Sequence, residues 1–125
     1  SNQQPQQIDI IKNLNFEVVF DVKAHTILKG LRNEWMQVWM NIISNALNVA
    51  QKRCIEHPKM VITLSDTSIH FHDNCQGIDL QIIENMRKNI YSGIGLKMCH
   101  DIVEKYGRKL LIQNSDEGMQ VTIEL

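Results

Sequence analysis

The 125-residue sequence lacks the features that mark several large classes of protein. It has two prolines, three cysteines and a formal net charge of −1. A charge so close to zero gives no strongly basic surface that could neutralise nucleic-acid phosphates, so no nucleic-acid partner is expected. No apolar run approaches the roughly 20 residues of a membrane-spanning helix, and no signal-peptide pattern opens the chain. We therefore expect no membrane contact by this domain itself.

The three cysteines, Cys54, Cys75 and Cys99, are odd in number and lack the spacing of metal ligands. They favour a reducing, cytoplasmic setting over a disulfide framework. The content of 43% hydrophobic and 22% charged residues is ordinary for one soluble globular domain. Residues 1–7 (SNQQPQQ) are polar and predict a flexible tail that includes a cloning remnant, which leaves residues 8–125 as the folded domain.

Hydrophobic periodicity predicts the element order β-β-α-β-β-α-α-β-β. Residues 16–22 largely alternate between apolar and polar, which predicts a half-buried strand, and residues 26–28 predict a short return strand. Apolar residues at helical spacing predict a long buried helix from Trp35 to about Cys54, with Asn33 as its cap. The remaining strands are expected over residues 60–64, 69–71, 110–113 and 119–125, and the remaining helices over residues 80–88, capped by Asp79, and 95–106, ended by Gly107. This order suggests a mixed sheet with helices on one face.

Three asparagines, Asn41, Asn45 and Asn48, lie four and three residues apart on the predicted long helix, which places their amides along one stripe. An amide oxygen is a hard neutral ligand that suits Mg²⁺, an ion that takes few protein ligands. An ordinary exposed polar face is the competing interpretation. Because asparagine is a poor helix former, three on one stripe favour a function slightly.

Residues 73–78 (DNCQGI) directly follow a predicted strand. A carboxylate at a strand end can accept a hydrogen bond from the exocyclic amine of adenine, and Gly77 permits a tight turn close to a ligand. Taken alone, these residues are more often an ordinary Asp-Asn turn.

Residues 92–96 (SGIGL) open the second long helix. Gly93 and Gly95 would expose backbone N–H groups to an anion, and the helix dipole adds to the attraction. A flexible loop beside a helix cap is the competing interpretation, and one GxG pair is weak evidence. In series, however, the three motifs form a metal-binding helix, an adenine-binding turn and a phosphate-binding loop, which together indicate nucleotide binding.

The three motifs resemble the signature boxes of one family. Residues 33–50 (NEWMQVWMNIISNALNVA) resemble the N box of sensor histidine kinases, within the GHKL ATPase superfamily, and residues 73–78 resemble the G1 box. The sequence from Ser92 to the end of the chain resembles the G2 box and the family's C-terminal segment. The resemblance covers about residues 16–125. It implies an α/β two-layer sandwich, the Bergerat fold, with a mixed, mostly antiparallel sheet of about five strands and three helices on one face. ATP would lie between the helices, under a lid that joins the G1 and G2 boxes.

The resemblance also implies roles for single residues. Asn45 corresponds to the asparagine that coordinates the metal, Asn41 to a residue one turn earlier in the same site, and Asp73 to the aspartate that reads adenine. Asn41 and Asn45 are thus the expected catalytic residues, with Asn45 as the Mg²⁺ ligand. The residues expected to bind ATP are Asn41, Asn45, Asn48, Asp73, Gly77, Ile78, Ser92, Gly93, Gly95 and Leu96.

Position 41 distinguishes branches of the superfamily. Relatives that hydrolyse ATP carry a glutamate there as general base, whereas the amide of Asn41 cannot take a proton. The resemblance therefore implies a protein histidine kinase of a two-component system, which transfers the γ-phosphoryl group of ATP to a histidine on a separate dimerisation domain that serves a response regulator. None of the five histidines of this chain lies in the acidic helix motif expected of that acceptor. The expected setting is cytoplasmic, including the cytoplasmic part of a membrane-bound sensor.

The sequence departs from the family pattern at four positions. Cys75 replaces the first glycine of the G1 box, Tyr91 the glycine that often opens the G2 box, Asn48 a phosphate-binding lysine, and Met119 a small residue or threonine. The segment between the two glycine boxes is shorter than usual and has no F box. These departures predict a nucleotide affinity that is low or depends on the partner domain.

Two alternatives stay open. The chain could be a degenerate domain that no longer binds ATP usefully and serves as an interaction or regulatory module. It could also be a stand-alone serine kinase of the anti-sigma-factor type, which shares this fold. The similarity of residues 33–47 to membrane-sensor versions argues against the second alternative.

Overall fold

The computed structural model describes residues 15–91 and 94–125. The tail predicted over residues 1–7 lies outside the described residues. The described chain forms, in order, β1 (Glu17–Val22), α2 (Arg32–Lys52), β2 (Lys59–Leu64), β3 (Ser68–Asp73), α3 (Leu80–Arg87), α4 (Ile94–Lys105), β4 (Lys109–Asn114) and β5 (Met119–Glu124).

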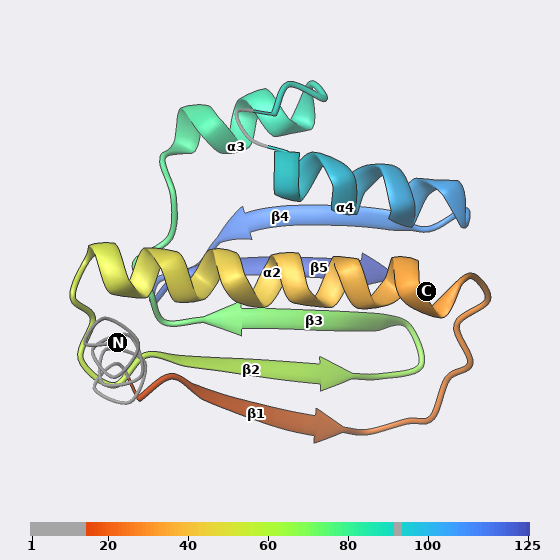
Figure 1. Ribbon diagram of the computed structural model, residues 1–125, viewed down its shortest axis with the longest axis horizontal. Coiled ribbons are helices and arrows are strands. Elements are labelled where there is room, and N and C mark those ends of the chain that lie inside the picture. Colours follow the sequence, from red (N-terminus) through yellow and green to blue (C-terminus); the bar gives the residue numbers. More distant parts are fainter. Residues whose placement is uncertain (1–14, 92–93) are drawn as a thin grey trace, which may run out of the picture.

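The five strands of the described chain form one sheet in the order β1-β2-β3-β5-β4 (Figure 1). Strand β1 pairs with β2 in parallel, with Glu17 opposite Lys59, and α2 makes the crossover between them. All the other strand pairs are antiparallel. The mixed, mostly antiparallel sheet of five strands is therefore confirmed.

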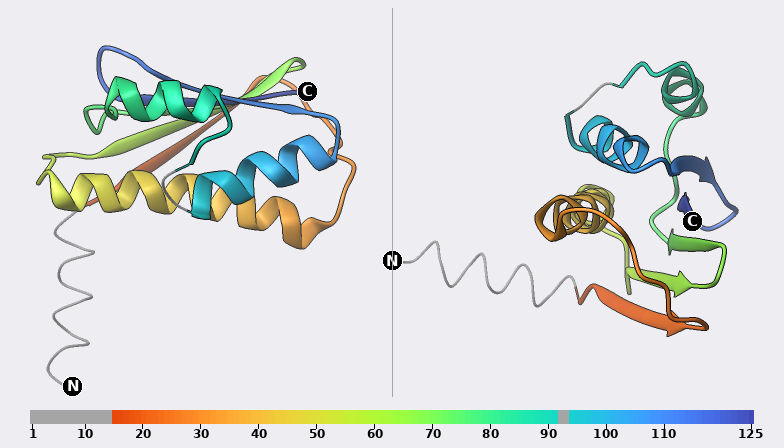
Figure 2. Two further views of the ribbon diagram at one scale, coloured as in Figure 1. Left: turned by 90° about the horizontal axis from the view of Figure 1, so that it is seen from above. Right: turned by 90° about the vertical axis from the view of Figure 1, so that its right-hand side faces the viewer.

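The helices form the second layer of the molecule. Helices α2 and α4 lie side by side over one face of the sheet, and α3 lies beside β4 (Figures 1 and 2). The α/β sandwich with three helices in the described chain matches the fold that the resemblance implied. None of the helices within residues 15–91 and 94–125 combines the length and apolar content needed to cross a membrane.

The hydrophobic core lies between the sheet and the two long helices. On α2 the buried side chains recur every three or four residues, as the periodicity predicted: Trp35, Val38, Ile42, Ala46 and Ala50. The other core residues come from α4 and from strands β2, β3 and β5: Cys99, Ile102, Val103, Met60, Ile62, Ile69, Phe71, Met119, Val121 and Ile123. Full burial of a large aliphatic side chain is worth roughly 1.5–3 kcal/mol. The apolar face of α2 therefore holds this helix on the sheet.

The short return strand predicted over residues 26–28 is wrong, because these residues lie in the loop between β1 and α2. The Lys23 N–H donates to Leu64 O at 2.8 Å, and the chain then leaves the sheet. Since β1 and β2 are parallel, the chain has to cross over through α2 instead of folding back in a hairpin. Within the short apolar run, Leu28 packs against the core whereas Ile27 is 89% exposed.

Asn33 is not the cap of α2, because the helix begins at Arg32 with Leu31 in the cap position. The side chain of Leu31 has no oxygen to accept a hydrogen bond, and a tertiary contact serves instead. The Tyr106 hydroxyl, just beyond α4, accepts a hydrogen bond from the Leu31 N–H at 2.9 Å and donates to Glu34 Oε1. The Nζ of Lys105 lies 2.9 Å from the same oxygen. The start of α2 is thus fixed by the end of α4.

Two other predicted helix boundaries are confirmed. Asp79 caps α3, where its Oδ1 accepts a hydrogen bond from the Gln81 N–H at 2.7 Å. Gly107 follows α4 with a φ of +73°, and the Arg108 N–H closes the end by donating to Val103 O at 3.1 Å. Both are local signals, which is why the sequence pattern sufficed.

The contact between Glu34, Tyr106 and Lys105 should make the stability depend on pH. Hydrogen bonds from Tyr106 and then from Lys105 hold the pKa of Glu34 below its ordinary value of 4.5. A carboxyl group whose pKa is lower in the folded than in the unfolded chain stabilises the fold above its unfolded pKa, and this contribution is lost as the pH falls through the folded pKa. Glu34→Gln should therefore lower the free energy of unfolding at neutral pH, and its difference from wild type should shrink below pH 4.5.

Urea denaturation from neutral to acid pH measures this difference. Glu56→Gln, at an exposed position after α2, is the control and should stay close to wild type throughout. A difference for Glu34→Gln that persisted undiminished in acid would contradict the role given to the Glu34 carboxylate.

Candidate functional site

Strand β3 ends on a buried carboxylate. Asp73 is 4% exposed, and among the described residues it is the only buried charged one. Its Oδ1 accepts hydrogen bonds from the Cys75 N–H at 2.9 Å and the Met119 N–H at 3.1 Å. These donors offset the cost of burying the charge. None of the described residues donates to the other oxygen, Oδ2, so it can accept a hydrogen bond from a ligand.

The turn after Asp73 has an unusual backbone. Two consecutive residues have a left-handed backbone, with φ of +74° at Gln76 and +69° at Gly77. Arg53, just beyond α2, donates through Nη1 to Cys75 O at 2.8 Å and also to Gly77 O. The turn is therefore bound to the end of α2.

Asn114, at the end of β4, holds the same turn from another side. Its Oδ1 accepts a hydrogen bond from the Ile78 N–H at 2.9 Å, and its Nδ2 donates to Ile78 O at 2.6 Å. The Oδ1 atom also lies 2.6 Å from the place that a Cβ of residue 77 would occupy. Position 77 thus requires glycine for two reasons, its positive φ and the lack of space.

Gly118, in the turn between β4 and β5, lies directly against Asp73. A Cβ at position 118 would overlap the backbone oxygen and the Oδ1 of Asp73. The buried carboxylate can occupy its place only because residue 118 has no side chain.

The asparagine stripe of α2 lies next to the first turn of α4. Asn41 and Asn45 are half-buried and Asn48 is exposed. A Cβ at Gly95 would lie 3.3 Å from Asn41 Oδ1 and 3.8 Å from Asn45 Nδ2, so the two helices approach closely here. The Nδ2 of Asn41 also contacts Met98 Sδ at 3.8 Å. The N-terminal end of α4, the positive end of its dipole, therefore lies beside the stripe.

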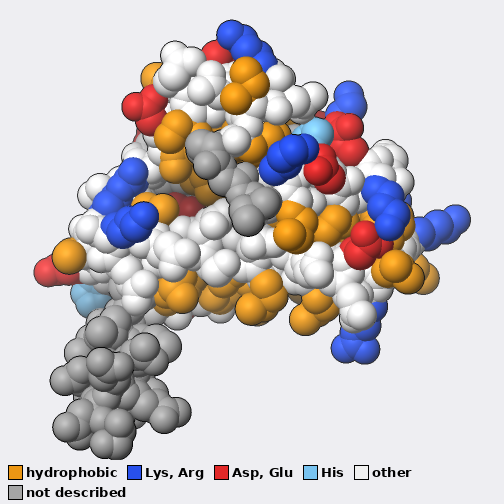
Figure 3. All heavy atoms as spheres, turned by 45° about the horizontal axis from the view of Figure 1, so that its top comes forward, with side chains coloured by type: hydrophobic (Ala, Val, Ile, Leu, Met, Phe, Trp, Pro, Cys, Tyr) orange, Lys and Arg blue, Asp and Glu red, His pale blue; other side chains and the backbone are white. Residues whose placement is uncertain are grey.

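A cavity of about 420 Å³ lies between these elements, within the range of roughly 300–1,000 Å³ that is usual for small-molecule sites. Figure 3 looks onto the helices and shows a hollow with an acidic side chain inside it; Asp73 is the acidic residue of the cavity lining. The full lining comprises Asn45, Ala46, Asn48, Val49, Lys52, Asp73, Cys75, Gly77, Ile78, Ile82, Met86, Tyr91, Gly95, Leu96 and Met119. One carboxylate and two amides thus converge in a mostly apolar cavity.

The cavity brings together seven of the ten residues that the sequence predicted to bind ATP: Asn45, Asn48, Asp73, Gly77, Ile78, Gly95 and Leu96. Ser92 and Gly93 lie outside the described residues. Asn41 does not line the cavity; it lies one turn before Asn45, against Gly95 and Met98.

Other residues of the lining were not among those predicted to bind ATP. Val49 and Lys52 continue the asparagine stripe by a further turn of α2, and helical spacing from Asn45 carried that signal. Ile82 and Met86 line the cavity from α3. Their i, i+4 spacing predicts a shared helix face, but the sequence does not say what that face meets.

Cys75 and Met119, two departures from the family pattern, are both buried and line the cavity. Burial, reinforced by the nearby Asp73 carboxylate, raises the pKa of the Cys75 thiol to about 11. The thiol is therefore neutral at physiological pH and acts as a small apolar group of the wall instead of a nucleophile.

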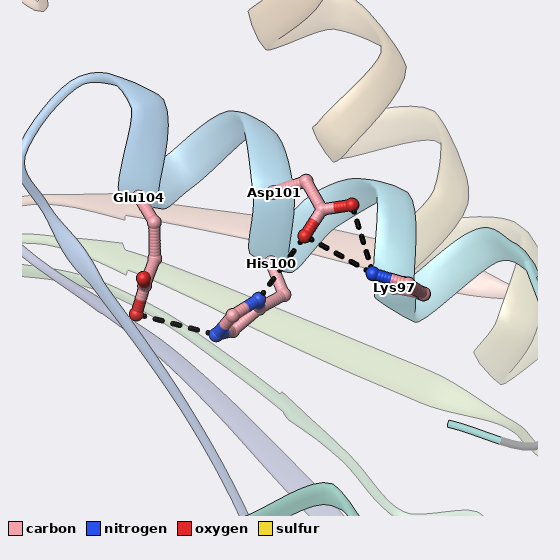
Figure 4. Close-up of polar contacts among 4 residues, drawn as sticks. All are labelled: Lys97, His100, Asp101 and Glu104. Atoms are coloured by element: carbon pink, nitrogen blue, oxygen red, sulfur yellow. Dashed lines mark hydrogen bonds and ion pairs between the residues drawn. The ribbon is translucent and has the colours of Figure 1, made fainter. Parts of the chain in front are cut away.

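Tyr91, another departure from the family pattern in the lining, packs against α4. Its ring packs against that of His100, with 5.6 Å between the centroids. Burial, followed by the carboxylates of Asp101 and Glu104, raises the pKa of Tyr91. The His100 ring lies 3.4 Å from Asp101 Oδ1 and 3.2 Å from Glu104 Oε1, and Lys97 pairs with Asp101 at 3.1 Å (Figure 4). These polar contacts fix the position of the His100 ring, against which Tyr91 packs.

The other histidines are bound within the fold or exposed. His70 Nδ1 lies 2.8 Å from Thr122 Oγ1, and His72 Nε2 lies 2.7 Å from Ser115 Oγ. Burial, with a further contribution from His72, lowers the pKa of His70. The remaining two histidines, His25 and His57, are exposed.

The donors of the cavity fit a hard metal ion. Among residues 15–91 and 94–125, no group of three or more His, Cys, Asp or Glu side chains could hold a metal. The available oxygen ligands are the amides of Asn45 and Asn48 and the carboxylate of Asp73. An ion that keeps several waters and shares the phosphates of its substrate, as Mg²⁺ does, fits this set better than a transition metal.

Comparisons with known proteins identify the family and the fold of the chain. The model of the family described as histidine kinase-, DNA gyrase B-, and HSP90-like ATPase matches residues 30–125. The chain is similar in structure to the cytoplasmic segment of histidine kinase QseC, with a TM-score of 0.65 and 17% identity over 97% of this chain and 70% of that one. It is also similar to the catalytic domain of histidine kinase ThkA, with a TM-score of 0.73 and 20% identity over 97% of this chain and 85% of that one.

A third similar structure is the ATP-binding domain of PrrB from Mycobacterium tuberculosis, with a TM-score of 0.65 and 18% identity over 89% of this chain and 79% of that one. No match was found among curated proteins. At these identities the structural matches establish the fold alone.

Gly118→Ala should damage the site through Asp73. The added methyl group overlaps the aspartate, so the backbone must shift, and overpacking of this kind costs about 1–3 kcal/mol. The amides of Cys75 and Met119, which donate to Asp73 Oδ1, should exchange hydrogen faster. Chemical denaturation and amide hydrogen exchange measure the two effects.

Gly107→Ala is the matched control, because nothing lies within 4 Å of its Cβ position and only its positive φ opposes the change. It should cost about 1 kcal/mol and leave the exchange of both amides unchanged. Equal exchange in the two variants would contradict the contact between Gly118 and Asp73.

Proposed function

The chain belongs to the family of histidine kinase-, DNA gyrase B-, and HSP90-like ATPases, and we propose that it is the ATP-binding catalytic domain of a two-component histidine kinase. It binds ATP with Mg²⁺ in the cavity between α2, α3 and α4 and transfers the γ-phosphoryl group to a histidine on a separate dimerisation domain. One observation carries this proposal: three motifs that are far apart in the sequence line a single cavity.

Asp73 reads the adenine base. Its Oδ1 is occupied by two backbone donors, so Oδ2 accepts the hydrogen bond from the exocyclic amine. Gly77 lines the same end of the cavity, and its N–H donates to none of the described residues, which leaves it for a second contact with the base. Apolar side chains of the lining, including Val49, Ile78 and Met119, suit the two faces of a purine ring.

The phosphate end of the cavity lies where α2 and α4 meet. Bound Mg²⁺ would supply positive charge that neutralises the phosphate oxygens and orients the transferred group. The Asn45 amide would hold this ion, and backbone N–H groups at the N-terminal end of α4 would hold phosphate oxygens. Ser92 and Gly93, which precede this helix in the sequence, are proposed to bind the same phosphates. Gly95 allows the first turn of α4 to come close to Asn45.

Among the described residues that line the cavity, none is placed to act as the general base that hydrolysis would need at this end. Asn41 cannot take a proton, and Asp73, the one carboxylate among the described lining residues, is engaged at the base end. Transfer to a protein acceptor needs chiefly positioning and charge neutralisation, which this site provides. The acceptor is a histidine of the dimerisation domain, and a response regulator is the next partner.

The cover over the cavity is small. In the described chain the segment between the glycine boxes consists mainly of α3, which contributes Ile82 and Met86. Full closure over ATP is therefore proposed to depend on the dimerisation domain. Since QseC is represented by a cytoplasmic segment, we assign the same cytoplasmic setting to this domain, where ATP is available.

Titration calorimetry with a non-hydrolysable ATP analogue and Mg²⁺ tests binding. Asp73→Asn should weaken binding about 10- to 100-fold, since a hydrogen bond to a charged group is worth roughly 1.5–3 kcal/mol. Asp66→Asn, in the exposed turn between β2 and β3, is the control and should bind as wild type does. Failure of the wild-type domain to bind at millimolar nucleotide would overturn the proposal.

Asn45→Ala should remove the dependence of nucleotide binding on Mg²⁺, because the ion loses its protein ligand. It should also abolish transfer of labelled phosphate from ATP to the histidine of the dimerisation domain. Asn33→Ala, an exposed asparagine on the same helix, should change neither. Tighter binding in Mg²⁺ that persists in Asn45→Ala would rule out Asn45 as the metal ligand.

A further inference from the structure

The turn after β3 has a backbone conformation that is unfavourable without contacts from the rest of the protein. Gln76 has a φ of +74°, which is unfavourable for a residue with a side chain. Such a conformation persists only where the surroundings determine it. The contacts of this turn therefore show which residues set its shape.

Two peptide groups of the turn are each held at both ends. In the peptide between residues 75 and 76, Arg53 donates to Cys75 O at 2.8 Å, and the Gln76 N–H donates to Glu117 O at 3.0 Å. In the peptide between residues 77 and 78, Arg53 donates to Gly77 O, and the Ile78 N–H donates to Asn114 Oδ1 at 2.9 Å. One nitrogen of Arg53 is thus common to both peptide groups.

The peptide between Gln76 and Gly77 lies between these two fixed groups. Neither its C=O nor its N–H bonds to any of the described residues. Its orientation is therefore set by its neighbours in the chain. Since Gly77 lines the cavity, this peptide group is available to a ligand.

Arg53 acts on the cavity from outside, because it is not among the lining residues. Its contacts with the turn are charge-assisted hydrogen bonds, which are stronger than those between neutral groups. Arg53 also continues α2, and the eight residues that separate it from Asn45 correspond to about 12 Å of helix. The helix that carries the proposed metal ligand therefore also fixes the turn at the other end of the cavity.

We infer that Arg53 is a positioning residue for recognition of the adenine base, acting through the carbonyl groups of Cys75 and Gly77. The inference rests on the proposed function and deepens it. Cys75, which replaces the first glycine of the G1 box, is buried and directly precedes the left-handed Gln76, so Arg53 binds the turn where its backbone is least favourable.

Two ligands distinguish binding at the base end from binding at the phosphate end: a non-hydrolysable ATP analogue, which has a base, and inorganic tripolyphosphate, which has none. Each is titrated with Mg²⁺. Arg53→Met keeps the apolar stem of the side chain and removes its donors. It should weaken binding of the ATP analogue about tenfold and leave the affinity for tripolyphosphate unchanged. Arg53→Lys can still donate to carbonyl groups. Its ratio of affinity for the ATP analogue to affinity for tripolyphosphate should therefore lie between those of Arg53→Met and wild type. Arg32→Met, at the other end of α2, is the matched control and should keep the wild-type ratio.

Amide hydrogen exchange in the ligand-free protein gives a second readout. In Arg53→Met the amides of Gln76, Gly77 and Ile78 should exchange faster than in wild type, and in Arg32→Met they should not. A ratio of affinities that stays at the wild-type value in Arg53→Met, or equal weakening of both ligands, would overturn the inference while the proposed function stands. If wild type binds neither ligand, the proposed function fails. Unchanged amide exchange in Arg53→Met would then overturn the positioning role of Arg53 as well. Faster exchange would still support the hydrogen bonds from Arg53 to the turn as the contacts that fix its shape.

Discussion

Helix α2 is held against the sheet and beside α4 by a row of buried side chains that includes Val38, Ile42 and Ala46. This burial fixes the rotation of the helix about its axis, and the rotation decides where every other side chain on it points. Because Asn45 and Asn48 lie beside the buried row, they are directed at the first turn of α4 and at the cavity. The burial of the apolar face of α2 thus determines where its asparagine side chains point.

The two ends of α2 are fixed by residues distant in sequence. At its start, Tyr106 accepts a hydrogen bond from the Leu31 N–H and donates to Glu34. Past its end, Arg53 binds the turn that follows Asp73. The helix therefore connects three parts of the molecule, namely the end of α4, the proposed metal site and the turn proposed to bind the base. A shift of α2 would change all three together.

Much of the fold followed from local patterns. The strands and the long helices were predicted because periods of two and of 3.6 residues are properties of the chain itself. The return strand over residues 26–28 and the Asn33 cap were wrong for one shared reason. In both places a distant partner decided the outcome: the parallel pairing of β1 with β2, and the hydroxyl of Tyr106.

The residues of the candidate site divide in the same way. The amino-acid sequence alone indicated the family and predicted the main residues of the candidate site, Asn45, Asp73 and Gly77, because their motifs are short and contiguous. It also determined that position 41 is an amide, which argues against a general base there. These are chemical properties of single residues and do not depend on how the chain folds.

Only the tertiary structure decided which residues hold those groups in place. Arg53, Asn114 and Gly118 contact Asp73 or the turn that follows it, from three different parts of the chain. Each looks ordinary in the sequence, because an arginine after a helix, an asparagine after a strand and a glycine in a turn are all common. Their importance comes from hydrogen bonds and close contacts between segments far apart in the chain. Such contacts exist only once the burial of α2 and the pairing of the strands have brought those segments together.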